Sequence, residues 1–189
     1  HAGRPCIFIR LTYCNLRCTY CDTEYAFYDG EDMENVDIMK KIHQWDCNLV
    51  EVTGGEPLLQ LDAALINAFH DAGFEVAVET NGTLPLPQGI DWVCLSPKAD
   101  AELAFIRCDE LKLVYPQLLA MPERFEHIEA DHYYLQPMAD YQPVVLASDK
   151  LEGAKEGLSG SNTQKALSYC LKHPKWKLSL QTHKMIGIE

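Results

Sequence analysis

The chain has 189 residues, of which 47% are apolar and 23% are charged, and its formal net charge is -12. This length predicts one domain over residues 1–189, with a substantial hydrophobic core. The negative charge argues against a surface that binds nucleic acid or anionic lipid, so a small-molecule substrate or a protein partner is expected. No apolar run approaches the roughly 18 residues of a membrane span, and the given sequence contains no basic, apolar, small-residue leader, which predicts a cytoplasmic protein.

Short apolar runs alternate with stretches that have helical periodicity. The predicted strands are residues 5–11, 49–53, 74–80, 91–96, 110–114, 132–137 and 176–182, and the predicted helices are residues 35–45, 61–73 and 161–173. In the first helix Asn35 is the expected N-cap, and Val36, Met39 and Ile42 share one face.

The helix over 61–73 has the clearest apolar stripe, and Gly73 is placed to end it. The stripe consists of Leu61, Leu65, Ala68, Phe69 and Ala72.

Alternation of strands and helices predicts an α/β fold with parallel strands, either a barrel or a doubly wound sheet. The link "NGTLPLPQGI" between residues 80 and 91 is about the minimum for a crossover and is a poor helix former. We therefore expect an abbreviated, open, partial (βα) barrel with fewer helices than a full TIM barrel. Residues 148–161 are rich in glycine, serine and charge, and they are predicted to form a mobile loop.

Eight cysteines are present, and three of them cluster as "CNLRCTYC". Cys14, Cys18 and Cys21 follow the first predicted strand, whereas the other five stand singly in mostly apolar segments and are expected to be small core residues. The Cys-x3-Cys-x2-Cys spacing suits a 4Fe-4S cluster whose fourth iron takes a ligand from outside the chain. A zinc site is the alternative, but it needs a fourth ligand, and Asp22, His43 or a distant cysteine has no recognisable zinc spacing.

Further polar motifs close other predicted strands: "GGEP" at 54–57, "TNG" at 80–82, "SPK" at 96–98, "QPM" at 136–138 and "QTH" at 181–183. Each alone is compatible with ordinary turn chemistry. Because active sites in parallel α/β folds lie at the carboxyl ends of the strands, the motifs together predict a functional site at that edge.

The run "CNLRCTYC", with Tyr20 before its last cysteine, and the "GGEP" turn resemble the radical S-adenosylmethionine (radical SAM) superfamily. The resemblance implies that Cys14, Cys18 and Cys21 hold the 4Fe-4S cluster and that S-adenosylmethionine chelates its open iron. Tyr20 and the turn residues Gly54, Gly55 and Glu56 would then bind this cofactor.

The ordered set "GRPCIFIR", "CDT", "TGGEPLLQ", "ETNGTLP", "DWVCLSPKA", "ELKLV", "YYLQPM" and "LSLQTHKMIGIE" is similar to the 7-carboxy-7-deazaguanine synthase family across nearly the whole chain. The similarity implies a lyase that converts 6-carboxy-5,6,7,8-tetrahydropterin to 7-carboxy-7-deazaguanine with loss of ammonia. The product is a precursor of deazapurines such as queuosine. The cofactor radical would do the chemistry, so no side chain is expected to be catalytic beyond it.

The resemblance also implies roles for single residues. Ser96 and Gln136 would contact S-adenosylmethionine, and Thr23 would give an oxygen ligand to Mg²⁺. Arg10 would pair with the substrate carboxylate, with Thr80, His183 and the terminal Glu189 as further substrate contacts. Lys98 and Lys184 stand near the predicted site, but surface ion pairs explain them equally well, so they receive no role.

The family carries a "QGEG"-like segment before its "GRP" turn, and the given sequence starts at "HAGRPC". We expect that an N-terminal segment is missing from the given sequence; the alternative is that the chain lacks part of the substrate pocket. The expected partners are the pterin, a reductant such as flavodoxin or ferredoxin, and a second copy of the chain in a homodimer, with no nucleic acid or membrane. Two alternatives are a radical enzyme that activates a protein glycine and a zinc-stabilised interaction domain.

Overall fold

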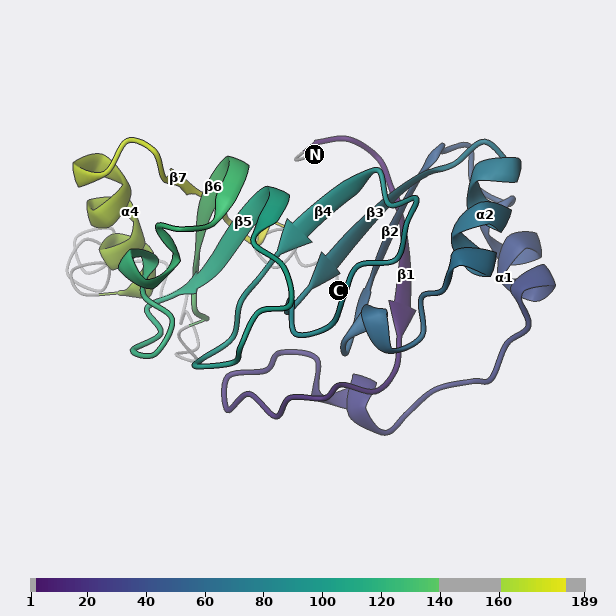
Figure 1. Ribbon diagram of the computed structural model, residues 1–189, viewed down its shortest axis with the longest axis horizontal. Helices are drawn as coiled ribbons and strands as arrows, with labels where there is room; N and C mark the ends of the chain where they lie inside the picture. Colours follow the sequence, from purple (N-terminus) through teal and green to yellow (C-terminus); the bar gives the residue numbers. More distant parts are fainter. Residues whose placement is uncertain (1–2, 140–160, 183–189) are drawn as a thin grey trace, which may run out of the picture.

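The computed structural model describes residues 3–139 and 161–182. One parallel seven-stranded sheet runs through them in the order β1-β2-β3-β4-β5-β6-β7, so neighbours in sequence are neighbours in the sheet. Figure 1 shows the sheet as an open, curved fan, with β1 and β7 at opposite ends. The strands are Ile7–Leu11 (β1), Leu49–Gly54 (β2), Glu75–Thr80 (β3), Trp92–Leu95 (β4), Arg107–Tyr115 (β5), Glu129–Pro137 (β6) and Lys177–Leu178 (β7). The prediction of an open, partial barrel is confirmed.

Three α-helices are described: Asn35–Ile42 (α1), Ala63–Asp71 (α2) and Asn162–Lys172 (α4). α1 and α2 lie together beside the first strands, and α4 lies against β6 and β7 (Figure 1). The Asp62 carboxylate accepts a hydrogen bond from Leu65 N at 2.8 Å at the start of α2, and Ser161 caps α4 in the same way. Gly73, with φ +83°, follows α2 as predicted.

No helix links β3 to β4 or β4 to β5, and both connecting segments are fully described. The prediction that the "NGTLPLPQGI" link lacks a helix is confirmed. Three short 3-10 helices, at Glu24–Phe27 (η1), Pro57–Leu59 (η2) and Pro122–Phe125 (η3), were not predicted because a single turn carries no periodic pattern.

The predicted elements differ from the structure in five details. Glu34 rather than Asn35 is the N-cap of α1, and Val36 is exposed because it faces away from α2 and the sheet. Ala72 lies at the exposed end of α2, while Ile66, outside the predicted stripe, is fully buried. The last strand is shorter than predicted, because β7 is an edge strand that pairs only at Lys177 and Leu178.

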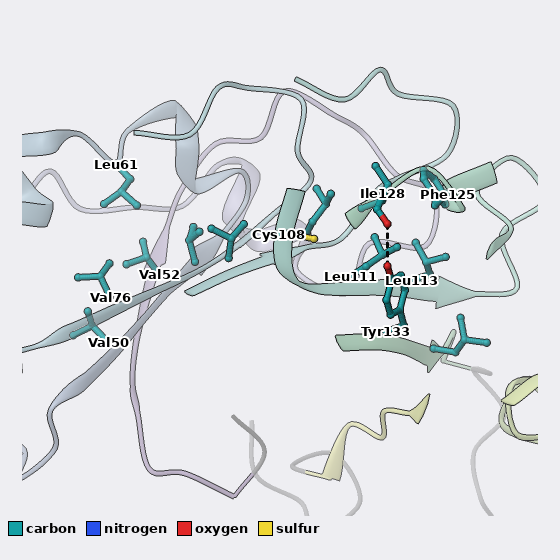
Figure 2. Packing of buried hydrophobic residues seen from close by; sticks show 14 of the residues in the cluster. Val50, Val52, Leu61, Val76, Cys108, Leu111, Leu113, Phe125, Ile128 and Tyr133 are labelled. Carbon is teal, nitrogen blue, oxygen red and sulfur yellow. Dashed lines mark hydrogen bonds between the residues drawn. The ribbon is translucent and has the colours of Figure 1, made fainter. Parts of the chain in front are cut away.

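The hydrophobic core lies on one face of the sheet. Val50, Val52, Val76 and Val78 point from β2 and β3 toward α2, and Leu111, Leu113 and Leu135 continue this layer across β5 and β6. Figure 2 shows Val50, Val52 and Val76 at one end of this layer and Leu111 and Leu113 at the other. Beside the latter, the Tyr133 hydroxyl donates to Ile128 O at 2.9 Å. Cys94 and Cys108 are buried, as predicted for isolated cysteines, but Cys6, Cys47 and Cys170 are only half-buried.

The opposite face of the sheet is polar. The register pairs Glu79 with Cys94 and Cys94 with Glu110, so these side chains share a face on which Lys112 also stands, two residues beyond Glu110. Parallel sheets are usually buried and apolar on both faces, so this composition is unusual. Among the described helices, none is long and apolar enough to cross a membrane.

Candidate active site at the carboxyl edge of the sheet

The three clustered cysteines lie on the loop that leaves the carboxyl end of β1. All eight cysteines are free thiols, and Cys14, Cys18 and Cys21 are half-buried, while the intervening Asn15 and Arg17 are exposed. The hydrogen bonds within the loop are few: Leu16 N lies 3.4 Å from Cys14 Sγ, and Cys21 N donates to Cys18 O at 3.2 Å. The exposed Arg17 guanidinium donates to Cys14 O at 2.5 Å and to Leu16 O at 2.9 Å. The loop therefore presents three thiols together without a regular secondary structure of its own.

The glycine turn after β2 packs directly against this loop. Gly55 N donates to Leu11 O at 3.0 Å, and Glu56 N donates to Tyr13 O at 2.8 Å. A Cβ atom on Gly54 would lie 1.9 Å from Leu11 O, and a Cβ atom on Gly55 would lie 2.0 Å from Tyr13 O. Only glycine permits this approach, so the predicted cluster loop and the predicted cofactor turn form one unit.

Glu56 is completely buried, and its carboxylate joins the ends of β2 and β3. Its Oε1 accepts from Thr80 Oγ1 at 2.6 Å and from Leu58 N at 3.1 Å, and its Oε2 accepts from Asn81 N at 2.7 Å. Burial raises the pKa of Glu56, while these three hydrogen bonds act in the opposite direction. This side chain therefore has an internal structural role that the sequence did not suggest.

The "SPK" turn brings a lysine into the site. Ser96 is buried, its N–H donates to Thr80 O at 2.8 Å, and Lys98 Nζ donates to Ser96 Oγ at 2.6 Å and to Ser96 O at 2.8 Å. Burial lowers the pKa of Lys98, and the nearby Glu79 opposes this shift without cancelling it. No carboxylate among the described residues forms a salt bridge with Lys98, contrary to the explanation by surface ion pairs. The position of Lys98 in a turn motif directly after a predicted strand was the sequence signal that could have indicated this contact.

Arg10 stands on β1 near the cysteine loop. Its guanidinium lies over the Tyr25 ring, 5.8 Å from the centroid, and no described carboxylate is within ion-pair distance of it. Thr23 begins the η1 turn, with its Oγ1 3.6 Å from Cys21 Sγ. A cation and a hydroxyl are thus available beside the cysteine loop.

The end of the described chain reaches the same region. Gln181 Nε2 donates to Asp22 Oδ2 at 3.1 Å, which joins residues 159 positions apart. Gln136 is the penultimate residue of β6 and is half-buried, so the "QPM" motif begins inside the strand rather than after it. His183, Lys184, Glu189 and nearly all of the predicted 148–161 loop lie outside the described residues.

Sequence reasoning missed two buried amides. The buried polar residues of the described chain are Glu56, Thr80, Asn81, Ser96 and Gln117, and all five lie at the carboxyl ends of the strands. Asn81 contacts the cysteine loop through Asn15, and Gln117 contacts it through Tyr20. Asn81 belonged to the "TNG" motif that marked this edge, whereas nothing in the sequence around Gln117 indicated its contacts.

The donors present fit an iron–sulfur cluster better than a single metal ion. Among the described residues, no group of three or more His, Cys, Asp or Glu side chains is arranged to hold one ion, so the zinc site has no support. A cluster takes one thiolate at each of several irons, so its ligands need not meet at a point. Three free thiols on one loop, backed by a glycine turn, match that requirement.

The comparisons with known proteins agree with this arrangement. Residues 8–104 match the family described as the radical SAM superfamily, so the chain belongs to that superfamily and uses a 4Fe-4S cluster and S-adenosylmethionine. A 7-carboxy-7-deazaguanine synthase from Bradyrhizobium diazoefficiens is 44% identical over 210 residues, covering 100% of this chain and 91% of the relative. One from Caulobacter vibrioides is 44% identical over 207 residues, covering 99% of this chain and 91% of the relative.

The chain therefore belongs to the 7-carboxy-7-deazaguanine synthase family. The crystal structure of QueE from Escherichia coli matches the fold with a TM-score of 0.70, covering 95% of this chain and 86% of that chain at 24% identity. Membership in this family favours the synthase prediction over both the glycine-activating enzyme and the zinc-stabilised domain.

Proposed function

We propose that the protein converts 6-carboxy-5,6,7,8-tetrahydropterin to 7-carboxy-7-deazaguanine, with loss of ammonia. The observation that carries the proposal is the cysteine loop packed on the glycine turn at the carboxyl edge of the sheet. The family relationship adds the substrate class, because relatives that align with the whole chain are named for this product.

In this proposal Cys14, Cys18 and Cys21 hold the cluster, and the Gly54–Gly55–Glu56 turn binds the methionine end of S-adenosylmethionine. Together the two groups supply a 5′-deoxyadenosyl radical when bound. The protein contributes by placing the substrate and excluding water. Glu56 acts mainly by fixing the turn, since its carboxylate oxygens already accept three hydrogen bonds. Tyr20, Ser96 and Gln136 are the further cofactor contacts.

The substrate is an anion, and this acidic protein offers it few cations. Arg10 has no described ion-pair partner, which leaves its guanidinium available for a bidentate bond to the pterin carboxylate. Thr80 Oγ1 donates to Glu56 and accepts from Gly82 N at 3.0 Å, so one lone pair is left to accept an N–H of the heterocycle.

Thr23, at the start of η1, is proposed to bind Mg²⁺ through its hydroxyl. His183 and Glu189 are proposed as further substrate contacts, and the Gln181–Asp22 bond supports a site to which the C-terminal segment contributes.

The proposed setting is a cytoplasmic homodimer of single-domain subunits, reduced by a flavodoxin or ferredoxin and without nucleic acid or membrane. The net charge of -12 supports the exclusion of phosphate-rich partners.

An anaerobic turnover tests the function. The cluster-reconstituted protein is incubated with S-adenosylmethionine, reductant, Mg²⁺ and the carboxytetrahydropterin, and products are followed by mass spectrometry. We expect 7-carboxy-7-deazaguanine from the wild type and none from Cys18→Ala, with Cys108→Ala as a cysteine control outside the loop. An intact cluster that cleaves S-adenosylmethionine without forming this product would refute the synthase function and leave a radical enzyme with another substrate.

A further inference from the structure

Three side chains form a closed hydrogen-bonded ring between the cysteine loop and the end of β3. Asn81 Nδ2 donates to Asn15 Oδ1 at 3.0 Å, and Asn15 Nδ2 donates to Thr83 Oγ1 at 2.7 Å. Thr83 Oγ1 in turn donates to Asn81 Oδ1 at 2.7 Å, and Thr83 N donates to the same oxygen at 3.0 Å. Asn15 directly follows Cys14, so the ring ties the first cluster ligand to the sheet.

A second tie acts at the other end of the loop. The Tyr20 hydroxyl, which lies between Cys18 and Cys21 in sequence, donates to Gln117 Oε1. The same oxygen accepts from Ala99 N at 3.1 Å, and Gln117 Nε2 donates to Val114 O at 2.9 Å. Gln117 therefore joins the loop to the "SPK" turn and to the last residues of β5.

These two amides hold a loop that has no regular secondary structure of its own. Residues 14–23 contain no helix or strand, so the loop cannot by itself hold three thiols in a fixed arrangement. Asn81 and Gln117 are 6% and 5% exposed, and each is hydrogen-bonded through both its amide oxygen and its amide nitrogen, so their positions are set by the sheet. Side chains behind metal ligands commonly control how firmly the metal is held.

We propose that Asn81 and Gln117 are positioning residues that hold the two ends of the cysteine loop in the geometry that retains the cluster. Asn81 acts through Asn15, and Gln117 acts through Tyr20. The proposal rests on the cluster site proposed above, and it concerns cluster retention rather than turnover.

The test follows the loss of iron from reconstituted holoenzyme challenged with a chelator under anaerobic conditions. The variants are Asn81→Ala, Asn15→Ala, their double variant and Gln117→Met, each measured well below its thermal unfolding midpoint. Asn48→Ala is the matched control, because Asn48 is an exposed asparagine at the amino end of β2 that bonds Arg4. Val76→Ala controls for general destabilisation, because Val76 is buried at the amino end of β3.

We expect Asn81→Ala and Gln117→Met each to lose iron about 10-fold faster or more, while both controls stay at the wild-type rate. The double variant should be no faster than the faster single one, because both substitutions open the same ring. If Asn81→Ala does not fold, Asn15→Ala tests the ring from its exposed side.

Wild-type rates in Asn81→Ala, Asn15→Ala and Gln117→Met would overturn the proposal, as would equal acceleration in Val76→Ala. A wild type that retains its cluster but makes no deazaguanine would refute only the synthase function. A wild type that assembles no cluster would refute the cluster site and this proposal with it.

Discussion

Glu56 is a buried side chain that connects several elements of the fold. It is a charged residue with no exposed surface, and its three hydrogen bonds join η2, β3 and the turn that follows β3. A buried carboxylate is tolerated because each of its oxygens has a donor.

Glu56→Gln should lower the free energy of unfolding by about 2–3 kcal/mol. The NH2 group of glutamine would replace a carboxylate oxygen that accepts a hydrogen bond, so two hydrogen-bond donors would face each other. Urea unfolding of the apo protein measures this change. Glu102→Gln, at an exposed glutamate, should remain within about 0.5 kcal/mol of the wild type. Equal stability of the two variants would contradict the internal role of Glu56.

Arg10→Gln should raise the KM for the carboxytetrahydropterin about 10-fold or more and change kcat little, because it removes a charge-assisted contact to a part of the substrate that does not react. Steady-state turnover over a substrate series measures the two constants. Arg10→Lys should restore only part of the affinity, because an ammonium cannot form the bidentate bond. An unchanged KM in Arg10→Gln would remove Arg10 from the substrate site.

At the scale of elements, the site depends on the contact between the β2 turn and the loop after β1. The glycine turn has two functions in this structure. Its backbone is the proposed cofactor contact, and the absence of side chains on the glycines lets its backbone pack directly against the backbone at Leu11 and Tyr13, where the loop begins.

Gly55→Ala tests this support without a change in backbone region. Its Cβ would meet Tyr13 O at 2.0 Å, so the variant should lose at least about 3 kcal/mol of stability and fail to retain iron after reconstitution. Gly73→Ala is the matched comparison: it has φ +83° but nothing within 4 Å, so it should cost only about 1–2 kcal/mol and keep its cluster. Retention of iron in Gly55→Ala would show that the loop does not need this contact.

The elements also show what could be predicted from sequence. The strands and the three helices follow from apolar periodicity, and the missing helix between β3 and β4 follows from a link too short and too rich in proline to form one. The clustered cysteines and the glycine turn were found through their local spacing. The contacts of Asn81 and Gln117 could not be predicted in this way. Asn81 bonds a residue 66 positions away and Gln117 bonds one 97 positions away, and a local sequence pattern does not encode such contacts.

At the scale of the whole molecule, the sheet separates an apolar face from a polar one. Burial raises the pKa of Glu51, on β2, to about 7, and the nearby Glu79 and Glu110 act in the same direction while Lys112 opposes them. Lys112 Nζ donates to Glu79 Oε2 at 2.8 Å, so the cation is already paired with one of these carboxylates. Lys98 also acts on Glu79, and the two lysines lower the pKa of that carboxyl, so Glu51 rather than Glu79 is the carboxyl with the raised pKa.

The raised pKa of Glu51, which burial causes first and the neighbouring carboxylates second, predicts a pH dependence of stability. A carboxyl whose folded pKa is raised binds more protons in the folded state, so its contribution is full below about pH 4.5 and is lost as pH rises to about 7. Glu51→Gln should therefore be more stable than the wild type at pH 8, by on the order of 2 kcal/mol, and should lack that advantage at pH 4.5. Urea unfolding at both pH values measures the difference. A variant that is less stable at pH 8 would contradict this account of the polar face.

In the proposed reaction, a radical generated at the carboxyl edge of the sheet acts on the carboxytetrahydropterin. The most direct measurement uses substrate deuterated at C6, with S-adenosylmethionine and reductant, and follows the isotope by mass spectrometry. We expect deuterium to move from the pterin into the 5′-deoxyadenosyl group as 7-carboxy-7-deazaguanine forms, and we expect neither from Cys18→Ala. Formation of that product with no deuterium in the 5′-deoxyadenosyl group would contradict the proposed reaction.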